Sequence, residues 1–108
     1  MLTFNTSNPQ SCGIVETDKE GVVIQFHEKS STPPSNRANG AVYVFDSFFL
    51  EKLQALGPHI TDFSTQVIPK FLGRIYTWHT NAMYLDIGTP KNLAQAQNLW
   101  PNPATHTP

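Results

Sequence analysis

Two short runs of β-branched residues on either side of a glycine-containing turn place the strongest constraint on how this chain folds. Residues 13–17 (GIVET) and 22–27 (VVIQFH) flank residues 18–21, which read Asp-Lys-Glu-Gly. β-Branched side chains favour strands, and Gly21 can take the positive φ that a tight turn requires. The pattern therefore predicts a β-hairpin.

Other segments also have the composition of strands. Residues 41–45 (AVYVF) are apolar almost throughout, which is typical of a strand covered on both faces. Residues 75–80 and 83–87 form a second candidate pair around an Asn-Ala turn, and residues 1–4 a further short strand. Residues 30–39 contain prolines and small polar residues that compete for the backbone, so we expect a loop there.

Three segments carry the capping and spacing signals of helices. Asp46 or Ser47 can cap a first helix that a Gly-Pro pair ends, and Asp62 can cap the amides at the start of a short helix that ends near Pro69. A Thr-Pro pair opens a last helix that Pro101 ends. Because strands and helices alternate, we expect an α/β layered fold. The inward-facing residues are predicted to be Phe49, Leu50, Leu53 and Leu56 in the first helix, and Leu93, Ala96, Leu99 and Trp100 in the last.

Composition excludes several classes of function. The 108 residues carry 7 Lys+Arg against 8 Asp+Glu, for a net charge of −1, so we expect one domain and no nucleic-acid partner. The apolar runs are far shorter than the roughly 20 residues that span a bilayer, and the first ten residues lack the features of a signal peptide. These features predict a cytoplasmic protein with no membrane partner. A single cysteine, Cys12, fits a reducing compartment.

Common catalytic and metal-binding motifs are absent from the sequence. The four histidines are scattered and Cys12 stands alone, which argues against a zinc site. The sequence contains no Gly-x-Ser-x-Gly motif, and its six glycines match neither a P-loop nor a dinucleotide-binding pattern. We therefore assign no catalytic residue within this chain.

Two places combine charged residues with a position suited to ligand binding. Glu28 and Lys29 close a predicted strand at the start of a loop, where the simpler interpretation is an exposed charge pair. Asp86 lies at the carboxyl end of a predicted strand just before a helix, which is where open α/β sheets bind ligands. The simpler interpretation of Asp86 is a helix cap.

Four segments resemble, in order and spacing, successive motifs of the sugar-1-phosphate nucleotidyltransferases: CGIVETDKEGVVIQFHEKS, ANGAVYVFD, DFSTQVIP and YLDIGTP. The resemblance runs from about Leu2 to Trp100. The second and third segments are most similar to the guanylyltransferases that act on mannose 1-phosphate or heptose 1-phosphate. The chain departs from the family's usual motifs at two places. Residues 28–30 read Glu-Lys-Ser where the family has Glu-Lys-Pro, and residues 39–41 read Asn-Gly-Ala where many members have Asn-Ala-Gly.

The resemblance implies a reaction and a set of site residues. The reaction joins a nucleoside triphosphate, here GTP, to a sugar 1-phosphate with release of pyrophosphate, and Mg²⁺ offsets the phosphate charge. The nucleotide sugar that forms would serve polysaccharide biosynthesis. Carried over by motif, the sugar-phosphate contacts are Gly13, Glu28, Lys29, Asn39 and Gly40, and Asp86 is one of two metal-binding carboxylates.

The resemblance also implies what this chain lacks. The family's Gly-rich nucleotide loop, its catalytic Arg and Lys, and its other metal-binding Asp have no counterpart here. We therefore expect a partial Rossmann-like mixed sheet with flanking helices, in which residues 1–100 are the C-terminal, sugar-phosphate-binding half and residues 101–108 an unstructured tail. Such a half would be inactive alone and would bind a nucleoside triphosphate only together with the missing half. Missing strands would leave a sheet edge that a homo-oligomer could cover.

Two other classes of function remain open. The chain could be a non-enzymatic module that binds sugar phosphates or associates with itself, or a folded fragment without function.

Overall fold

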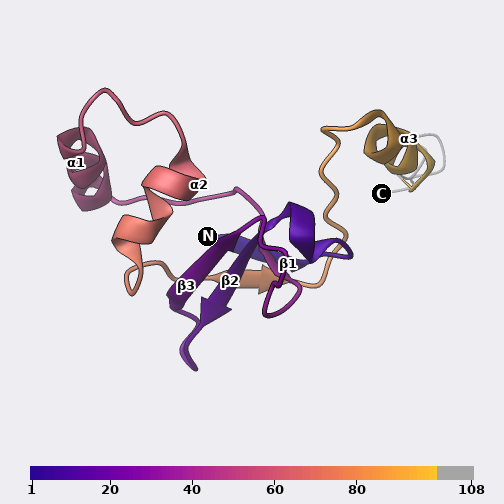
Figure 1. The fold of residues 1–108 in the computed structure, drawn as a ribbon, viewed down its shortest axis with the longest axis horizontal. Helices are drawn as coiled ribbons and strands as arrows, with labels where there is room; N and C mark the ends of the chain where they lie inside the picture. Colours follow the sequence, from indigo (N-terminus) through magenta and orange to yellow (C-terminus); the bar gives the residue numbers. More distant parts are fainter. Residues whose placement is uncertain (100–108) are drawn as a thin grey trace, which may run out of the picture.

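The computed structural model describes residues 1–99 and consists of a mixed five-stranded sheet with flanking helices, as expected for the α/β class (Figure 1). The strands lie in the order β3-β2-β4-β1-β5. Strand β5 runs parallel to β1, and the other neighbours are antiparallel. The strands are β1 (Leu2–Asn5), β2 (Gly13–Thr17), β3 (Val23–Glu28), β4 (Arg37–Asn39) and β5 (Trp78–Thr80).

The predicted hairpin is confirmed by the pairing of β2 with β3. In its turn, one carboxylate oxygen of Asp18 accepts hydrogen bonds from the amides of Glu20 at 2.9 Å and Val22 at 3.0 Å. Gly21 has a φ of 84°, as the turn requires. The expected short strand at the N-terminus is also confirmed, as β1.

The prediction of a buried strand at residues 41–45 is wrong. The strand of this region, β4, lies just before it, within the segment expected to be a loop. Ala41 has a φ of 57°, which turns the chain away from the ladder, and beyond it only the Val42 carbonyl is paired, accepting from the Leu2 amide at 2.9 Å. Because no strand lies alongside the rest of the segment within residues 1–99, most of its side chains stay exposed, with 95% of Val44 accessible.

The predicted second pair of strands also differs from the structure. Residues 75–80 form a strand only in β5, and residues 83–87 form none. The two segments do not pair with each other, since β5 pairs with β1 at the other end of the sequence. Local sequence favoured a hairpin, whereas the parallel pairing depends on a contact between distant segments.

The helices begin where their caps were predicted. Asp46 accepts a hydrogen bond from the Phe49 amide at 2.8 Å, and Asp62 accepts from the Ser64 amide at 3.1 Å and the Thr65 hydroxyl at 2.7 Å. Such N-caps satisfy amides that have no partner inside the helix. The helical elements are η1 (Pro9–Ser11), α1 (Ser47–Ala55), α2 (Phe63–Gln66), the 3-10 turn η2 (Ile68–Phe71) and α3 (Pro90–Leu99).

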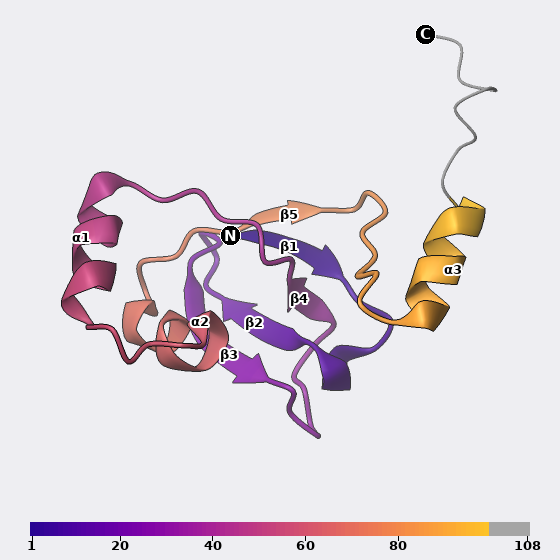
Figure 2. The same cartoon turned by 90° about the horizontal axis from the view of Figure 1, so that it is seen from above.

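The core lies between the sheet and the α2–η2 segment. Its buried residues are Thr3, Ile14, Val15, Val22, Val23, Ala38, Val67 and Ile68. Helices α1 and α2 lie at one end of the sheet and α3 at the other (Figures 1 and 2). Burial of these side chains, most of them β-branched, stabilises the packing of the sheet against the α2–η2 segment.

Helix α3 does not bury the face that its sequence predicts. Leu93 and Leu99 are 42% and 52% exposed, so the prediction that they face inward is wrong, as it is for Leu50 of α1, which is 48% exposed. Figure 2 shows α3 projecting from the sheet on the side opposite α1. Trp100, which was expected to face inward, and the predicted tail at residues 101–108 lie outside the described residues. Within residues 1–99, no helix is both long enough and apolar enough to cross a membrane.

Candidate functional site

Strand register brings three of the predicted site residues into one row across the sheet. Glu28 pairs with Gly13, the β2–β4 pairing places Gly13 opposite Asn39, and Asn39 pairs with Thr3, which in turn pairs with His79. Laterally paired residues project from the same face of a sheet. The three site residues thus share one face, although they come from three different strands.

Close packing explains the glycine at position 13. A Cβ added to Gly13 would collide with the Phe26 ring and lie 3.0 Å from a carboxylate oxygen of Glu28. Glycine therefore lets Phe26 and Glu28 lie over the backbone of β2. The Phe26 ring lies against the backbone of Gly13 in this structure, and the role of Gly13 in sugar binding stays a prediction.

Glu28 and Lys29 are adjacent charges that do not pair with each other. Lys29 has a φ of 50°, and its amide donates to the Cys12 carbonyl at 3.1 Å, which turns the chain at the end of β3. Within residues 1–99, neither the Glu28 carboxylate nor the Lys29 ammonium has an ion-pair or side-chain hydrogen-bond partner. The two charges therefore do not form an ion pair with each other, and both groups are available to a ligand.

Asn39 is held at both ends of its side-chain amide. Its nitrogen donates to the Tyr43 hydroxyl at 2.7 Å, and its oxygen accepts from the Ala41 amide at 2.9 Å. Burial raises the pKa of Tyr43, the hydrogen bond from Asn39 opposes that rise, and the negative charges of Glu28 and of ionised Tyr84 add to it. Tyr43 therefore lies within electrostatic reach of Glu28. Sequence analysis missed this tyrosine because it lies in an apolar run.

Gly40 anchors a second tyrosine. Its carbonyl accepts a hydrogen bond from the Tyr84 hydroxyl, and its amide donates to the Leu2 carbonyl at 2.8 Å. The Tyr84 ring stacks on Phe4 with 4.1 Å between centroids. A Cβ at Gly40 would lie 3.1 Å from the Leu2 carbonyl oxygen and 3.4 Å from the Tyr84 ring, so the glycine permits this packing. Whether Gly40 also touches a sugar stays a prediction.

Asp86 lies in an exposed loop next to this tyrosine. One of its oxygens accepts from the Gly88 amide at 2.8 Å, whereas the Thr89 hydroxyl accepts from the Asn92 amide at 3.1 Å in the first turn of α3. Thr89 therefore caps the helix, and the interpretation of Asp86 as the cap is wrong. Burial raises the pKa of Tyr84, and the negative charges of Asp86 and Cys12 raise it further.

The described residues do not form a metal site by themselves. Within residues 1–99, no group of three or more His, Cys, Asp or Glu side chains is placed to hold a metal ion. Asp86 offers a carboxylate, the ligand type that Mg²⁺ prefers, on the same loop as Tyr84. It fits the role of one ligand among several.

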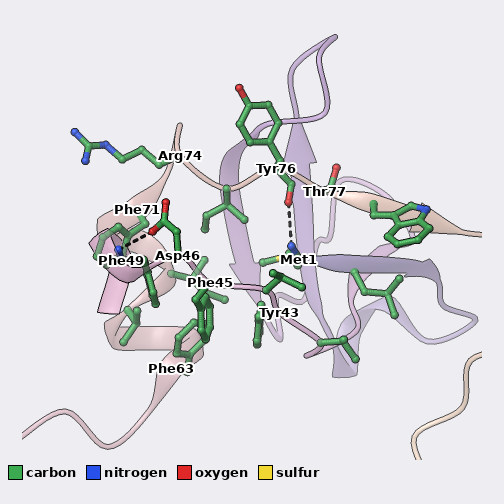
Figure 3. A pocket seen from close by; sticks show the side chains of 17 residues that line it. Met1, Tyr43, Phe45, Asp46, Phe49, Phe63, Phe71, Arg74, Tyr76 and Thr77 are labelled. Atoms are coloured by element: carbon green, nitrogen blue, oxygen red, sulfur yellow. Dashed lines mark hydrogen bonds between the residues drawn. The ribbon is translucent and has the colours of Figure 1, made fainter. Parts of the chain in front are cut away.

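The structure also contains an apolar cavity of about 680 Å³, and Tyr43 is one of the residues that line it (Figure 3). We call it the aromatic trough. None of the six predicted site residues lines it, whereas Tyr43 lines it and also accepts the hydrogen bond from Asn39. Its lining residues are Met1, Leu2, 42–46, Phe49, Phe63, Val67, Ile68, Phe71 and 74–78.

Comparison with known proteins identifies the family. The sequence profile of the nucleotidyl transferase family matches residues 1–102, which is most of the chain. The chain belongs to the nucleotidyl transferase family. This assignment confirms the family-level expectation drawn from the four motifs.

Similar nucleotidyl transferases include two named as glucose-1-phosphate adenylyltransferases. The protein of Thermotoga neapolitana is 35% identical over 92 residues, which cover 78% of this chain and 22% of the relative. The protein of Mycoplasma mobile is 30% identical over 105 residues, which cover 89% of this chain and 28% of the relative. The chain therefore spans about a quarter of the length of the relatives that it matches.

Proposed function

We propose that this chain forms the sugar 1-phosphate-binding part of a nucleotidyl transferase. The observation that carries the proposal is the row of Glu28, Gly13 and Asn39 across three strands, with Lys29 directly beside it. A carboxylate, an amide and an ammonium without ion-pair partners among residues 1–99 suit a ligand that has both hydroxyl groups and a phosphate.

Each side chain has a chemical role in this proposal. Glu28 accepts hydrogen bonds from sugar hydroxyls, and Lys29 contacts the phosphate oxygens. Asn39 contributes the lone pairs and hydrogens of an amide whose orientation is fixed by Tyr43 and Ala41. Fixing the amide beforehand lowers the entropy lost when the sugar binds.

The sugar proposed first is glucose 1-phosphate, with ATP as the nucleotide of the whole enzyme. The names of the two relatives support this choice. A second candidate is mannose 1-phosphate or heptose 1-phosphate with GTP, which is supported by the resemblance of the segments ANGAVYVFD and DFSTQVIP to guanylyltransferases. The same row of residues would bind either sugar.

We further propose that Asp86 is one ligand of the Mg²⁺ ion that the reaction uses. When bound, the ion would neutralise phosphate charge. Within residues 1–99 no glycine-rich nucleotide loop is present, so we expect this chain alone to bind sugar 1-phosphate without catalysing transfer. A role as a sugar-phosphate-binding module without catalysis would need the same site, and only turnover by a longer protein would distinguish the two.

Calorimetric titration of the 108-residue chain tests the proposal. Glucose 1-phosphate is expected to bind, whereas glucose and inorganic phosphate bind more weakly because each offers only part of the recognised chemistry. Lys29→Met should weaken binding of glucose 1-phosphate by about tenfold, the scale of one charge-assisted hydrogen bond.

Lys19→Met is the matched control, because Lys19 lies in the hairpin turn at the opposite end of β2 from Gly13. It should leave the affinity unchanged. Absence of binding, or equal weakening by both variants, would refute the proposed site. A parallel titration with mannose 1-phosphate would decide between the two sugars.

A further inference from the structure

Asn39 is the only asparagine in the sequence that is followed by a glycine. The backbone nitrogen that follows an asparagine can attack the side-chain carbonyl carbon, which makes asparagine one of the chemically labile residues. Glycine has no Cβ, so it leaves this nitrogen accessible and lets the backbone reach the conformation that the attack requires. The pair of Asn39 and Gly40 is therefore the place where the sequence most readily modifies itself.

The contacts of the Asn39 side chain favour this attack. Its oxygen accepts a hydrogen bond from the Ala41 amide at 2.9 Å, and that amide stabilises the negative charge that the oxygen gains when a nucleophile adds to the carbonyl carbon. Its nitrogen, which has to leave as ammonia, lies 2.7 Å from the Tyr43 hydroxyl. Burial raises the pKa of Tyr43, so the hydroxyl keeps the proton that the leaving nitrogen needs.

The attacking nitrogen, in contrast, is held by the sheet. Gly40 is buried, and its amide donates to the Leu2 carbonyl at 2.8 Å where β4 lies beside β1 (Figure 2). The nitrogen has to lose its proton to water before it can attack, and this bond and the burial keep water from that proton. Tyr84 strengthens the junction, because its ring stacks on Phe4 of β1 and its hydroxyl donates to the Gly40 carbonyl.

The contacts that favour the attack and those that prevent it differ in range. Ala41 and Tyr43 lie two and four positions from Asn39 along the chain, so their contacts persist when distant segments separate. The partners of Gly40 are Leu2 on a different strand and Tyr84, which is 44 positions away. Local opening can break such distant contacts while nearby ones survive. Separation of β1 from β4 would therefore free the nitrogen beside an activated carbonyl carbon.

We propose that Asn39 is a self-modification site whose reaction is controlled by the bond between Gly40 and Leu2. When β1 separates from β4, the Gly40 nitrogen loses its proton to water and bonds to Cγ of Asn39, and the bond from Cγ to Nδ2 breaks. The leaving nitrogen departs as ammonia with a proton from Tyr43, which water restores. Water then opens the cyclic imide at either carbonyl, and the product is aspartate or isoaspartate.

The product changes the charge of one face of the sheet. Asn39 and Glu28 lie on the same face, on either side of Gly13. A carboxylate at position 39 adds a second negative charge to this row, and it removes the amide hydrogens that Asn39 donates to Tyr43. The reaction itself requires no sugar, so this inference is independent of the proposed function.

Peptide mapping by mass spectrometry tests the inference on the 108-residue chain in mildly alkaline buffer, with and without urea. The measured quantity is the rate at which the peptide that contains residue 39 changes from amide to acid. In urea, Asn39 should react faster than Asn81, which an alanine follows. In the folded chain, Asn39 should react at least about tenfold more slowly than in urea, because only molecules with an open β1–β4 pair react. Asn39→Gln should abolish the reaction in both conditions.

Tyr84→Phe tests the control by the sheet. The variant removes the hydrogen bond to the Gly40 carbonyl and keeps the ring that stacks on Phe4. We expect the reaction at Asn39 to become about fivefold faster in the folded state, the equivalent of one hydrogen bond, and to keep its rate in urea. Tyr76→Phe is the matched control, because Tyr76 is 70% exposed, and it should leave both rates unchanged.

Hydrogen exchange of the Gly40 amide provides a second measurement that needs no substitution. Low concentrations of urea that speed exchange at Gly40 should speed the reaction at Asn39 in proportion, since both require the bond to Leu2 to open.

Three results would overturn the inference. The first is an equal rate at Asn39 in the folded and the urea-unfolded chain. The second is an equal folded-state rate in Tyr84→Phe, Tyr76→Phe and the parent chain. The third is a rate at Asn39 that does not follow the exchange of the Gly40 amide.

Discussion

The side-chain amide of Asn39 donates to the hydroxyl of Tyr43 at 2.7 Å, and this bond joins the row of predicted site residues to the aromatic trough. The Tyr43 ring packs against Phe63 at 4.7 Å and Phe45 at 5.7 Å between centroids. The orientation of a proposed sugar-binding amide therefore depends on a ring held by the aromatic cluster.

Replacement of that hydroxyl should affect binding more than folding. Tyr43→Phe keeps the ring contacts and removes the acceptor for Asn39, so we expect a loss of about 1 kcal/mol in unfolding free energy and weaker binding of glucose 1-phosphate. Chemical denaturation and calorimetry measure the two effects. Tyr76→Phe is the control, because Tyr76 is 70% exposed and should change neither quantity. Unchanged affinity in Tyr43→Phe would show that the amide does not depend on this bond.

Within residues 39–41, the residue with a left-handed backbone conformation is Ala41, whereas the glycine stands one position earlier. Ala41 adopts a φ of 57°, whereas Gly40 does not have a positive φ. Ala41→Gly should therefore raise the unfolding free energy by about 1 kcal/mol.

Gly40→Ala is the matched comparison at the neighbouring position. It should destabilise the fold, since its Cβ would lie 3.1 Å from the Leu2 carbonyl oxygen. Thermal or urea unfolding of the two variants checks both signs. A destabilised Ala41→Gly would contradict the left-handed geometry at that residue.

The stability of the fold should fall in mildly acidic solution because of His79. Its ring nitrogen lies 2.9 Å from the hydroxyl of Thr3, which is fully buried. Burial, and then the charge of Arg37, lower the pKa of His79 below its ordinary value of 6.5. The unfolded chain therefore takes up the proton first, and the contribution of neutral His79 is complete above that value and is lost as the pH falls below it.

Urea unfolding at about pH 7.5 and about pH 5.5 measures this dependence. His79→Gln should flatten it, whereas His59→Gln, at an exposed position of the α1–α2 loop, should not. The same pH dependence in all three proteins would assign the effect to another group.

The proposed metal ligand has its own test. In a full-length nucleotidyl transferase that contains this chain, Asp86→Asn should abolish Mg²⁺-dependent turnover and leave the folded state intact, because an amide is a much poorer ligand than a carboxylate for a hard cation. Broadening of nearby resonances by Mn²⁺ supplies a readout that does not depend on turnover. Asp18→Asn, in the hairpin turn, is the control for a general change in charge. Activity or Mn²⁺ broadening that survives in Asp86→Asn would exclude the proposed role.

Local signals in the sequence were sufficient for the elements that are stabilised locally. The hairpin follows from the turn at Asp18 and Gly21, and α1 and α2 start at the caps Asp46 and Asp62, since each of these contacts joins residues only a few positions apart. The structure departs from the predictions where pairing is distant. The apolar composition of residues 41–45 indicates a strand, but a strand also requires a partner, and beyond Val42 the segment has none within residues 1–99.

The candidate site was predictable only in part, for the same reason. The family resemblance selected Gly13, Glu28 and Asn39, and the register of three strands brings them together. The sequence did not predict the roles of Tyr43 and Tyr84, because each role depends on a hydrogen bond, with Asn39 for Tyr43 and with the Gly40 carbonyl for Tyr84. The bond from Tyr84 to Gly40 joins residues 44 positions apart. A tyrosine inside an otherwise apolar run is the signal that would have pointed to Tyr43, since a buried hydroxyl needs a partner.

The central claim is that sugar 1-phosphate binds on the row formed by β3, β2 and β4. The most direct test is a titration of the isotope-labelled chain with glucose 1-phosphate, followed by the backbone amide resonances. The account predicts saturable shifts at Gly13, Glu28, Lys29, Asn39 and Gly40, with no change in the hairpin turn at residues 18–21. Shifts confined to the residues that line the aromatic trough, or no shifts at all, would contradict it.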